Sequence, residues 1–111
     1  MDGLQAINEL NAMSKSLSNE IDKLEQEGIK TARAESIYKM TLRTEALKLK
    51  ADNMAVTLID KVVYGIDEVA QARLKRDIAE VRYKVAQERI NGLKLQMRLL
   101  ESQIEREWGR E

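Results

Sequence analysis

Apolar residues recur every three or four positions along nearly all of this 111-residue chain, which is the spacing of one face of an α-helix. Between residues 4 and 50, no proline and no cluster of turn-forming residues interrupts the pattern. The sequence therefore predicts a long helix over 4–50. The apolar residues expected to share one face in its first half are Leu4, Ile7, Leu17, Ile21 and Leu24.

From residue 29 onward, the apolar positions of this predicted helix form two tracks. One track holds Ile29, Ala32, Met40 and Leu47, and the other holds Ala34, Tyr38, Leu42, Ala46 and Leu49. Because a helix with one neighbour buries only one stripe, two tracks predict two neighbours. Gly28 costs about 1 kcal/mol relative to alanine inside a helix, so a mild bend or a close helix approach is expected there.

The chain is predicted to turn after residue 50, because Asp52 and Asn53 favour turns and caps. The next apolar run predicts a short helix over 58–64, capped by Thr57 and ended by Gly65 in the left-handed conformation. A strand is the alternative, because valine, isoleucine and tyrosine favour strands. We prefer the helix, because no other segment offers a strand to pair with it.

A second long helix is predicted over 67–108, because Asp67 and Glu68 suit a helix N-terminus and Gly109 follows as a stop. It also carries two apolar tracks. The first track is Ala79, Tyr83, Ala86, Ile90, Leu93, Met97, Leu100, Ile104 and Trp108. The second is Leu74, Ile78, Val81, Val85, Gly92, Leu95 and Leu99. Since the two long helices have similar lengths, they are expected to pack antiparallel.

The predicted fold class is therefore all-α: a single domain over 1–111, built as an antiparallel, coiled-coil-like long helical hairpin with a short helix at the tip. One apolar track of each helix is left over, so we expect an oligomeric helical bundle. The expected interface residues are Tyr38, Leu42, Leu49, Ile90, Leu93, Met97, Leu100, Ile104 and Trp108. Trp108 is expected to pack near Leu4 and Ile7, against a second subunit, or to remain half-exposed.

Enzymatic chemistry has little support in this composition, because the chain contains no histidine and no cysteine. Activated serine and thiolate nucleophiles are thereby excluded in their usual forms. Carboxylate pairs such as Glu101 with Glu105 have basic residues nearby and are interpreted as solvated ion pairs. The sequence thus predicts a non-enzymatic protein with no catalytic residue, cofactor or metal site.

Acidic and basic side chains balance at nineteen each, but residues 37–98 carry thirteen basic and eight acidic groups. This basic region is a candidate nucleic-acid surface. Its candidate contact residues are Lys39, Arg43, Lys48, Lys50, Arg73, Lys75 and Arg76. A charged solvent face explains the same pattern, because acidic residues are interleaved and no aromatic stacking platform accompanies it.

The N-terminal residues lack the basic patch and apolar run of a signal peptide, and no stretch has the length and apolarity of a membrane span. We therefore expect a cytoplasmic protein with no membrane partner. Its expected partner is a second copy of itself.

Several strings carry a resemblance to a known group of proteins: VTLID at 56–60, VVYG at 62–65, LKRDIAE at 74–80, LQMRLLE at 95–101 and EW at 107–108. Over about 8–108, the chain resembles small helical proteins of temperate phages and prophages of Gram-positive bacteria. The resemblance implies an interaction or accessory factor in phage DNA replication or recombination, and it assigns no functional residue. It also implies a cytoplasmic protein of a bacterial host cell, with a phage or host protein as a further candidate partner. The alternatives are nucleic-acid binding, or counter-defence by binding a host protein or a signalling nucleotide.

Overall fold

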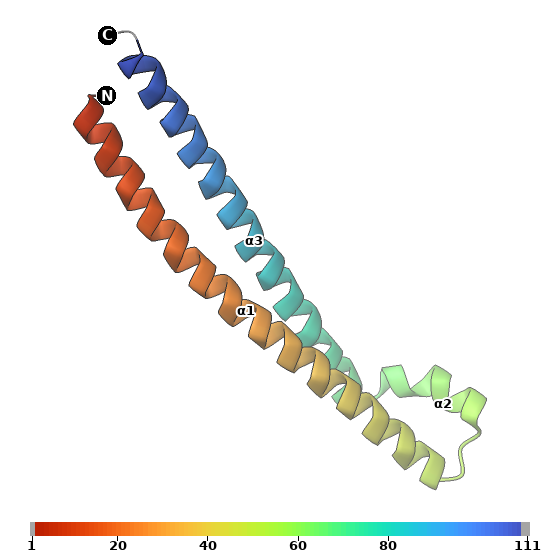
Figure 1. Cartoon of the computed structure of the whole chain (residues 1–111). Coiled ribbons are helices and arrows are strands. Elements are labelled where there is room, and N and C mark those ends of the chain that lie inside the picture. Colours follow the sequence, from red (N-terminus) through yellow and green to blue (C-terminus); the bar gives the residue numbers. More distant parts are fainter. Residues whose placement is uncertain (1, 110–111) are drawn as a thin grey trace. The chain divides into compact units, whose positions relative to one another are not determined.

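The computed structural model describes residues 2–109, and within that range it is all-α with no strand. The chain forms helix α1 (Gly3–Ala51), helix α2 (Val56–Val62), the 3-10 helix η1 (Val63–Gly65) and helix α3 (Asp67–Trp108) (Figure 1). The two predicted long helices agree with these bounds to within one residue, and the short helix begins two residues earlier than expected. The helical prediction for 58–64 is confirmed over its strand alternative.

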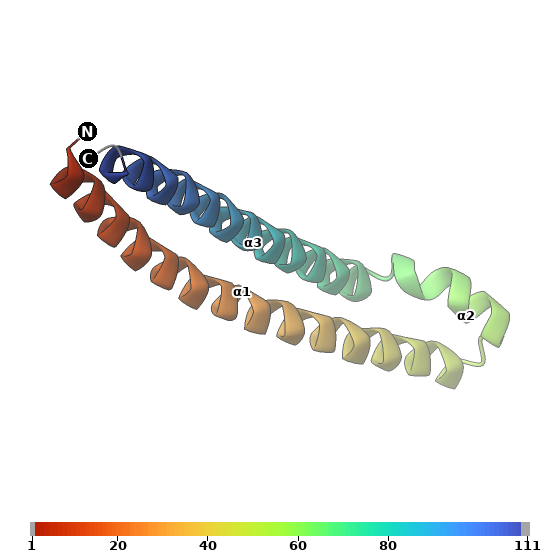
Figure 2. The ribbon, with the colours of Figure 1, turned by 45° about the horizontal axis from the view of Figure 1, so that its top comes forward.

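The chain divides into two compact units. Unit 1 is formed by the N-terminal part of α1, up to Gln26, and the part of α3 from Lys84 onward. Unit 2 is the continuous segment Glu27–Tyr83. Within each unit, α1 and α3 lie side by side and run in opposite directions, as both views show (Figures 1 and 2). The helical hairpin is thus confirmed, and the single domain and the oligomeric bundle stay predictions.

The buried stripe of α1 follows alternating steps of three and four residues, the seven-residue repeat of coiled coils. Its members are buried or half-buried: Gly3, Ala6, Leu10, Met13, Leu17, Glu20, Leu24, Glu27, Thr31, Ala34 and Tyr38. The face predicted for the first half of this helix is therefore partly wrong. Leu17 and Leu24 belong to the stripe, but Leu4, Ile7 and Ile21 lie one residue beyond its members and are exposed.

Helix α3 carries the matching stripe, which we call the inner stripe. Its residues are buried or half-buried: Val69, Ala72, Arg76, Ala79, Tyr83, Ala86, Ile90, Leu93, Met97, Leu100 and Ile104. From Ala79 to Ile104 it coincides with the first track predicted from the sequence. Because the spacing again alternates between three and four, each unit packs its two helices in the manner of a coiled coil.

The turn after α1 is made by Asn53, which has a left-handed φ of 64°. The backbone N–H of Met54 donates to the carbonyl of Leu49 at 3.1 Å, which closes the end of α1. Helix α2 starts at an extended Ala55 with no side-chain cap, so the predicted Thr57 cap is wrong. Gly65 is not left-handed either, because the extended Ile66 supplies the link into α3 without a positive φ.

Unit 2 has a core built from all four of its helical elements. Tyr38, Ile59, Val63, Val69 and Ala72 are buried together in it. The half-buried residues around this cluster are Leu42, Ala46, Leu49, Met54 and Ile66. Tyr38, Leu42 and Leu49, which are among the residues expected at an oligomer interface, pack in the core of unit 2.

Two contacts in unit 2 fix how closely α1 and α3 approach. A Cβ added at Gly28 would lie 3.3 Å from Cε2 of Tyr83, so the glycine makes room for the ring. One turn further along α1, the hydroxyl of Thr31 lies 3.1 Å from the carbonyl oxygen of Ala79 and 2.8 Å from that of Glu27. The expected close approach at Gly28 is confirmed.

Unit 1 has a thinner core: of its described residues, only Ala6, Ala86, Ile90 and Leu100 are buried. At its end, the indole of Trp108 lies beside Gly3, where an added Cβ would be 3.2 Å from Nε1. The ring remains 57% exposed. Trp108 therefore packs on the first turn of α1, as expected, but against Gly3 and only in part.

Candidate interaction surface

The residues predicted to form an oligomer interface lie mostly on the packed face of the helix pairs. In unit 1, Ile90 and Leu100 are buried, while Leu93, Met97 and Ile104 are half-buried. In unit 2, Tyr38, Leu42 and Leu49 belong to the core described above. The structure gives these side chains a role within one chain, and their contribution to an oligomer stays a prediction.

The second predicted track of α3 lies on the solvent-exposed face, and we call its large side chains the outer stripe. In unit 2 these are Leu74, Ile78 and Val81, which are 53%, 43% and 61% exposed. In unit 1 they are Val85, Leu95 and Leu99, which are 44%, 53% and 62% exposed. The outer stripe repeats at the same steps of three and four, or their sums, as the inner one, so it is shaped like a helix-packing face without a helix on it.

Helix α1 also leaves large apolar side chains exposed in unit 2, namely Ile29, Ile37, Met40 and Leu47. Over the described residues, eighteen large apolar side chains are exposed, whereas nine apolar residues are buried and three of those are alanines. Exposed apolar patches often mark interaction sites, so these side chains are candidates for one. The surface left open by the chain is therefore the strongest functional feature of the structure.

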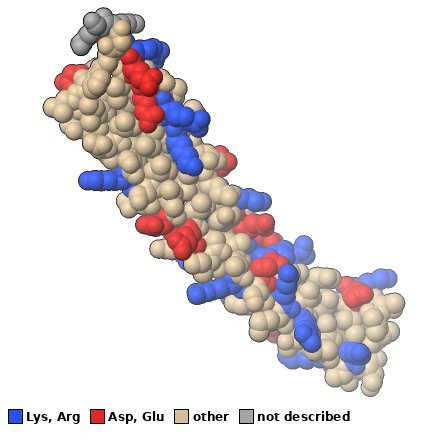
Figure 3. Space-filling view, in the orientation of Figure 1, with Lys and Arg blue, Asp and Glu red and all other residues tan. Residues whose placement is uncertain are grey.

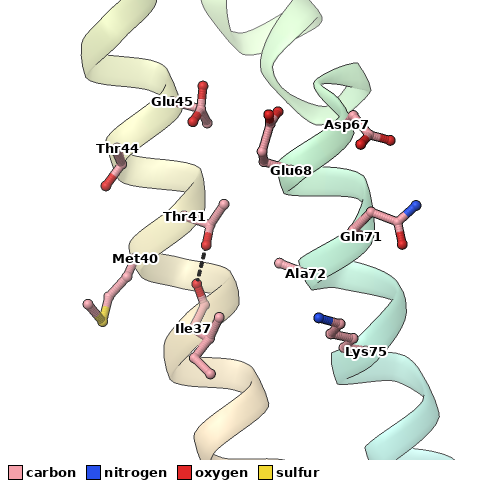
Figure 4. Close-up of a pocket in the computed structure, with 10 residues that line it drawn as sticks. All are labelled: Ile37, Met40, Thr41, Thr44, Glu45, Asp67, Glu68, Gln71, Ala72 and Lys75. Atoms are coloured by element: carbon pink, nitrogen blue, oxygen red, sulfur yellow. Dashed lines mark hydrogen bonds between the residues drawn. The ribbon is translucent and has the colours of Figure 1, made fainter.

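A groove runs beside Lys75 in unit 2, and we call it the Lys75 groove. It joins three hollows with volumes of about 580, 380 and 200 Å³, each of which Lys75 lines. Figure 4 shows the largest hollow, with Glu45 and Glu68 toward one end and Lys75 toward the other. Apolar Ala34, Ile37 and Ala72 line the middle of the groove beside Lys75.

Three of the seven candidate nucleic-acid residues are engaged by acidic side chains. Nζ of Lys39 lies 3.5 Å from Oε1 of Glu35, and Nζ of Lys48 lies 3.1 Å from Oε1 of Glu45. Arg76 Nη2 lies 3.0 Å from Oδ1 of Asp77. These pairs reduce the positive potential that a phosphate backbone would meet.

Arg76 has a structural role in addition to its ion pair with Asp77. Its guanidinium lies 4.4 Å from the ring centroid of Tyr38, and Nε lies 3.6 Å from Oε2 of Glu35. The hydrogen bond to Asp77 raises the pKa of Arg76 above its ordinary value. Arg76 thus covers Tyr38 and links α3 to α1 within unit 2.

The other four candidates, Arg43, Lys50, Arg73 and Lys75, are exposed and have no ion pair with any side chain in 2–109. Basic and acidic groups alternate over the face seen in Figure 3. Basic side chains therefore do not form one continuous surface on that face.

Two glutamates occupy the buried stripe of α1, which the sequence analysis did not anticipate. Oε2 of Glu20 and Oε2 of Glu27 are buried and have no hydrogen-bond partner. Their other oxygens lie 3.6 Å from Lys23 and 3.7 Å from Lys30, respectively. The spacing in the sequence could have identified both glutamates as members of the stripe, because their positions continue its alternating steps of three and four residues.

No set of three or more acidic side chains within 2–109 is arranged to hold a metal ion. None of the helices within that range has the length and apolarity needed to cross a membrane. No protein family, curated protein or solved structure was found to match the chain.

Proposed function

We propose that this protein is a non-enzymatic, self-associating helical hairpin that acts as an interaction or accessory factor. The observation that supports this proposal is the outer stripe, which repeats like a packed helix face while remaining about half exposed. Burying apolar area contributes about 25 cal/mol per Å², and a second copy offers the same kind of surface. Self-association would therefore cover what one chain leaves open.

The proposed process is the one that the phage resemblance implies, an accessory role in DNA replication or recombination. Nucleic-acid binding is a weaker candidate than self-association, because Lys39, Lys48 and Arg76 already have acidic neighbours. If the basic region bound DNA, gel shifts would show steep salt dependence and would be lost with Arg73→Glu and Lys75→Glu. Our proposal predicts no such shift at physiological salt.

The test is to replace Ile78 and Val85 together by glutamine and to compare sedimentation velocity with that of the wild-type protein. Both side chains are exposed, so the helical content should be unchanged while the oligomer dissociates. The control is Arg73→Gln, which changes an exposed residue of α3 outside the outer stripe. A variant that sediments as the wild-type oligomer would contradict the role of the outer stripe.

A further inference from the structure

The Lys75 groove has opposite charges at its two ends. Lys30, Arg33 and Arg82 line the hollows at one end. Glu45, Asp67 and Glu68 line the hollow at the other end. Both sets belong to unit 2, where antiparallel packing brings the start of α3 beside the later part of α1 (Figure 4). Glu27 also lines the first end, and Lys75 lines all three hollows. The groove is therefore mainly basic at one end and acidic at the other, with Lys75 beside the apolar residues of its middle.

Much of this charge is not neutralised within the chain. Arg33 and Arg82 have no acidic partner within ion-pair distance among residues 2–109, and neither Asp67 nor Glu68 has a basic one. Lys30 lies 3.7 Å from Glu27, and Glu45 lies 3.1 Å from Lys48. Four groups of the groove are thus available to a partner that presents the opposite charges.

The charges are spaced almost symmetrically about the apolar middle. Along α1, Lys30 precedes Ile37 by seven residues and Glu45 follows it by eight. At 1.5 Å per residue these positions lie roughly 10 and 12 Å from Ile37. A two-fold axis near Ile37 would therefore bring the basic end of one copy over the acidic end of another.

Such symmetry makes the groove complementary to itself. In a two-fold contact, residue i of one copy meets residue j of the other, and j meets i. Antiparallel docking would set the Lys30 end of each copy on the Glu45 end of its partner, and Ile37 and Met40, 56% and 65% exposed, would pack in the centre. Parallel docking would set like charges together and is disfavoured.

We propose that a second copy of this chain docks antiparallel in the Lys75 groove to form a four-helix contact centred on Ile37. The inference rests on the proposed self-association and adds a second contact surface, which meets the outer stripe at Ile78, with its orientation and its register. A polyanion would suit the basic end alone, but it would be repelled by Asp67 and Glu68 at the other end. A second copy matches both ends.

The first test reverses one end of the groove at a time. Lys30→Glu with Arg33→Glu, and separately Glu45→Lys with Glu68→Lys, should each weaken self-association by about tenfold or more, because each dimer contains every altered contact twice. Mixing the two variants should restore wild-type affinity as a heterodimer, which a misfolded variant could not do. The charge-matched control is Lys50→Glu with Lys61→Glu, exposed residues of unit 2 outside the groove.

The second test fixes the orientation and uses the absence of native cysteine. Arg33→Cys and Thr44→Cys chains, distinguished by mass tags, are mixed and oxidised. Antiparallel docking predicts the mixed 33–44 disulfide, whereas 33–33 and 44–44 products would overturn it. If the wild-type chain is monomeric, both proposals fail. If it self-associates but the reversed variants do so equally well, only the groove is excluded.

Discussion

The two units use the same helix pair but differ in how they close their cores. In unit 2, α2 and η1 supply Ile59 and Val63 to a cluster that also buries Tyr38 and Val69. Unit 1 has only its helix pair, and two of its four buried residues, Ala6 and Ala86, are alanines. Since stability follows buried apolar area, unit 2 should be the more stable of the two.

This difference shows what a short third element contributes to a pair of helices. Two helices packed along one stripe bury only that stripe, whereas α2 and η1 enclose the side chains they contact. Unit 1 lacks such an element, so we expect it to unfold more easily than unit 2.

The first prediction concerns the core of unit 2. Tyr38→Ala removes a buried ring that packs on Ile59, Val63, Val69 and Ala72, and it should lower the free energy of unfolding by about 3 to 4 kcal/mol. The control is Tyr64→Ala, because that tyrosine of the same unit is 48% exposed. Urea unfolding followed by circular dichroism measures both. Equal losses for the two variants would show that the cluster is not the core of unit 2.

The second prediction concerns unit 1 and uses two neighbouring leucines. Leu100 is 7% exposed and Leu99 is 62% exposed. Leu100→Ala should cost about 2 to 3 kcal/mol of unfolding free energy, and amide exchange should accelerate in unit 1. Leu99→Ala should leave folding nearly unchanged and weaken association instead. The reverse result would mean that the inner and outer stripes have been exchanged.

The third prediction compares two helical glycines and has the smallest expected effect. A Cβ at Gly92 meets nothing within 4 Å, so Gly92→Ala should stabilise unit 1 by about 1 kcal/mol through helix propensity. At Gly28 an added Cβ would lie 3.3 Å from the Tyr83 ring, so Gly28→Ala should stabilise the protein by less than Gly92→Ala does. Thermal melts of both variants decide this, and a larger gain at Gly28 would refute the close approach.

Much of the fold was predictable because periodicity and end signals agree. Asp67 and Gly109 placed the ends of α3, and both apolar tracks of that helix exist as predicted. The sequence could not show which track faces α1, since both have helical spacing. The structure packs the track that contains Ala72, Ala79 and Ala86, small residues that allow close helix approach.

The candidate surface was less predictable, because helical spacing alone does not show which apolar track is packed and which is exposed. Buried positions at Glu20 and Glu27 were overlooked because charged residues rarely occupy a packed stripe. The predicted interface followed the track that proved to be packed within the chain, whereas the exposed track was left unassigned. The polarity of the Lys75 groove depends on which α1 and α3 residues become neighbours, and spacing within one helix does not contain that information.

The most direct test of the central claim is the mass of the wild-type protein in solution. Light scattering over a dilution series, from about 100 μM to about 1 μM, reports self-association through mass action. We predict a mass that is a multiple of the 12.7 kDa chain at high concentration and that falls on dilution. A fully helical particle of 12.7 kDa at every concentration would contradict the account.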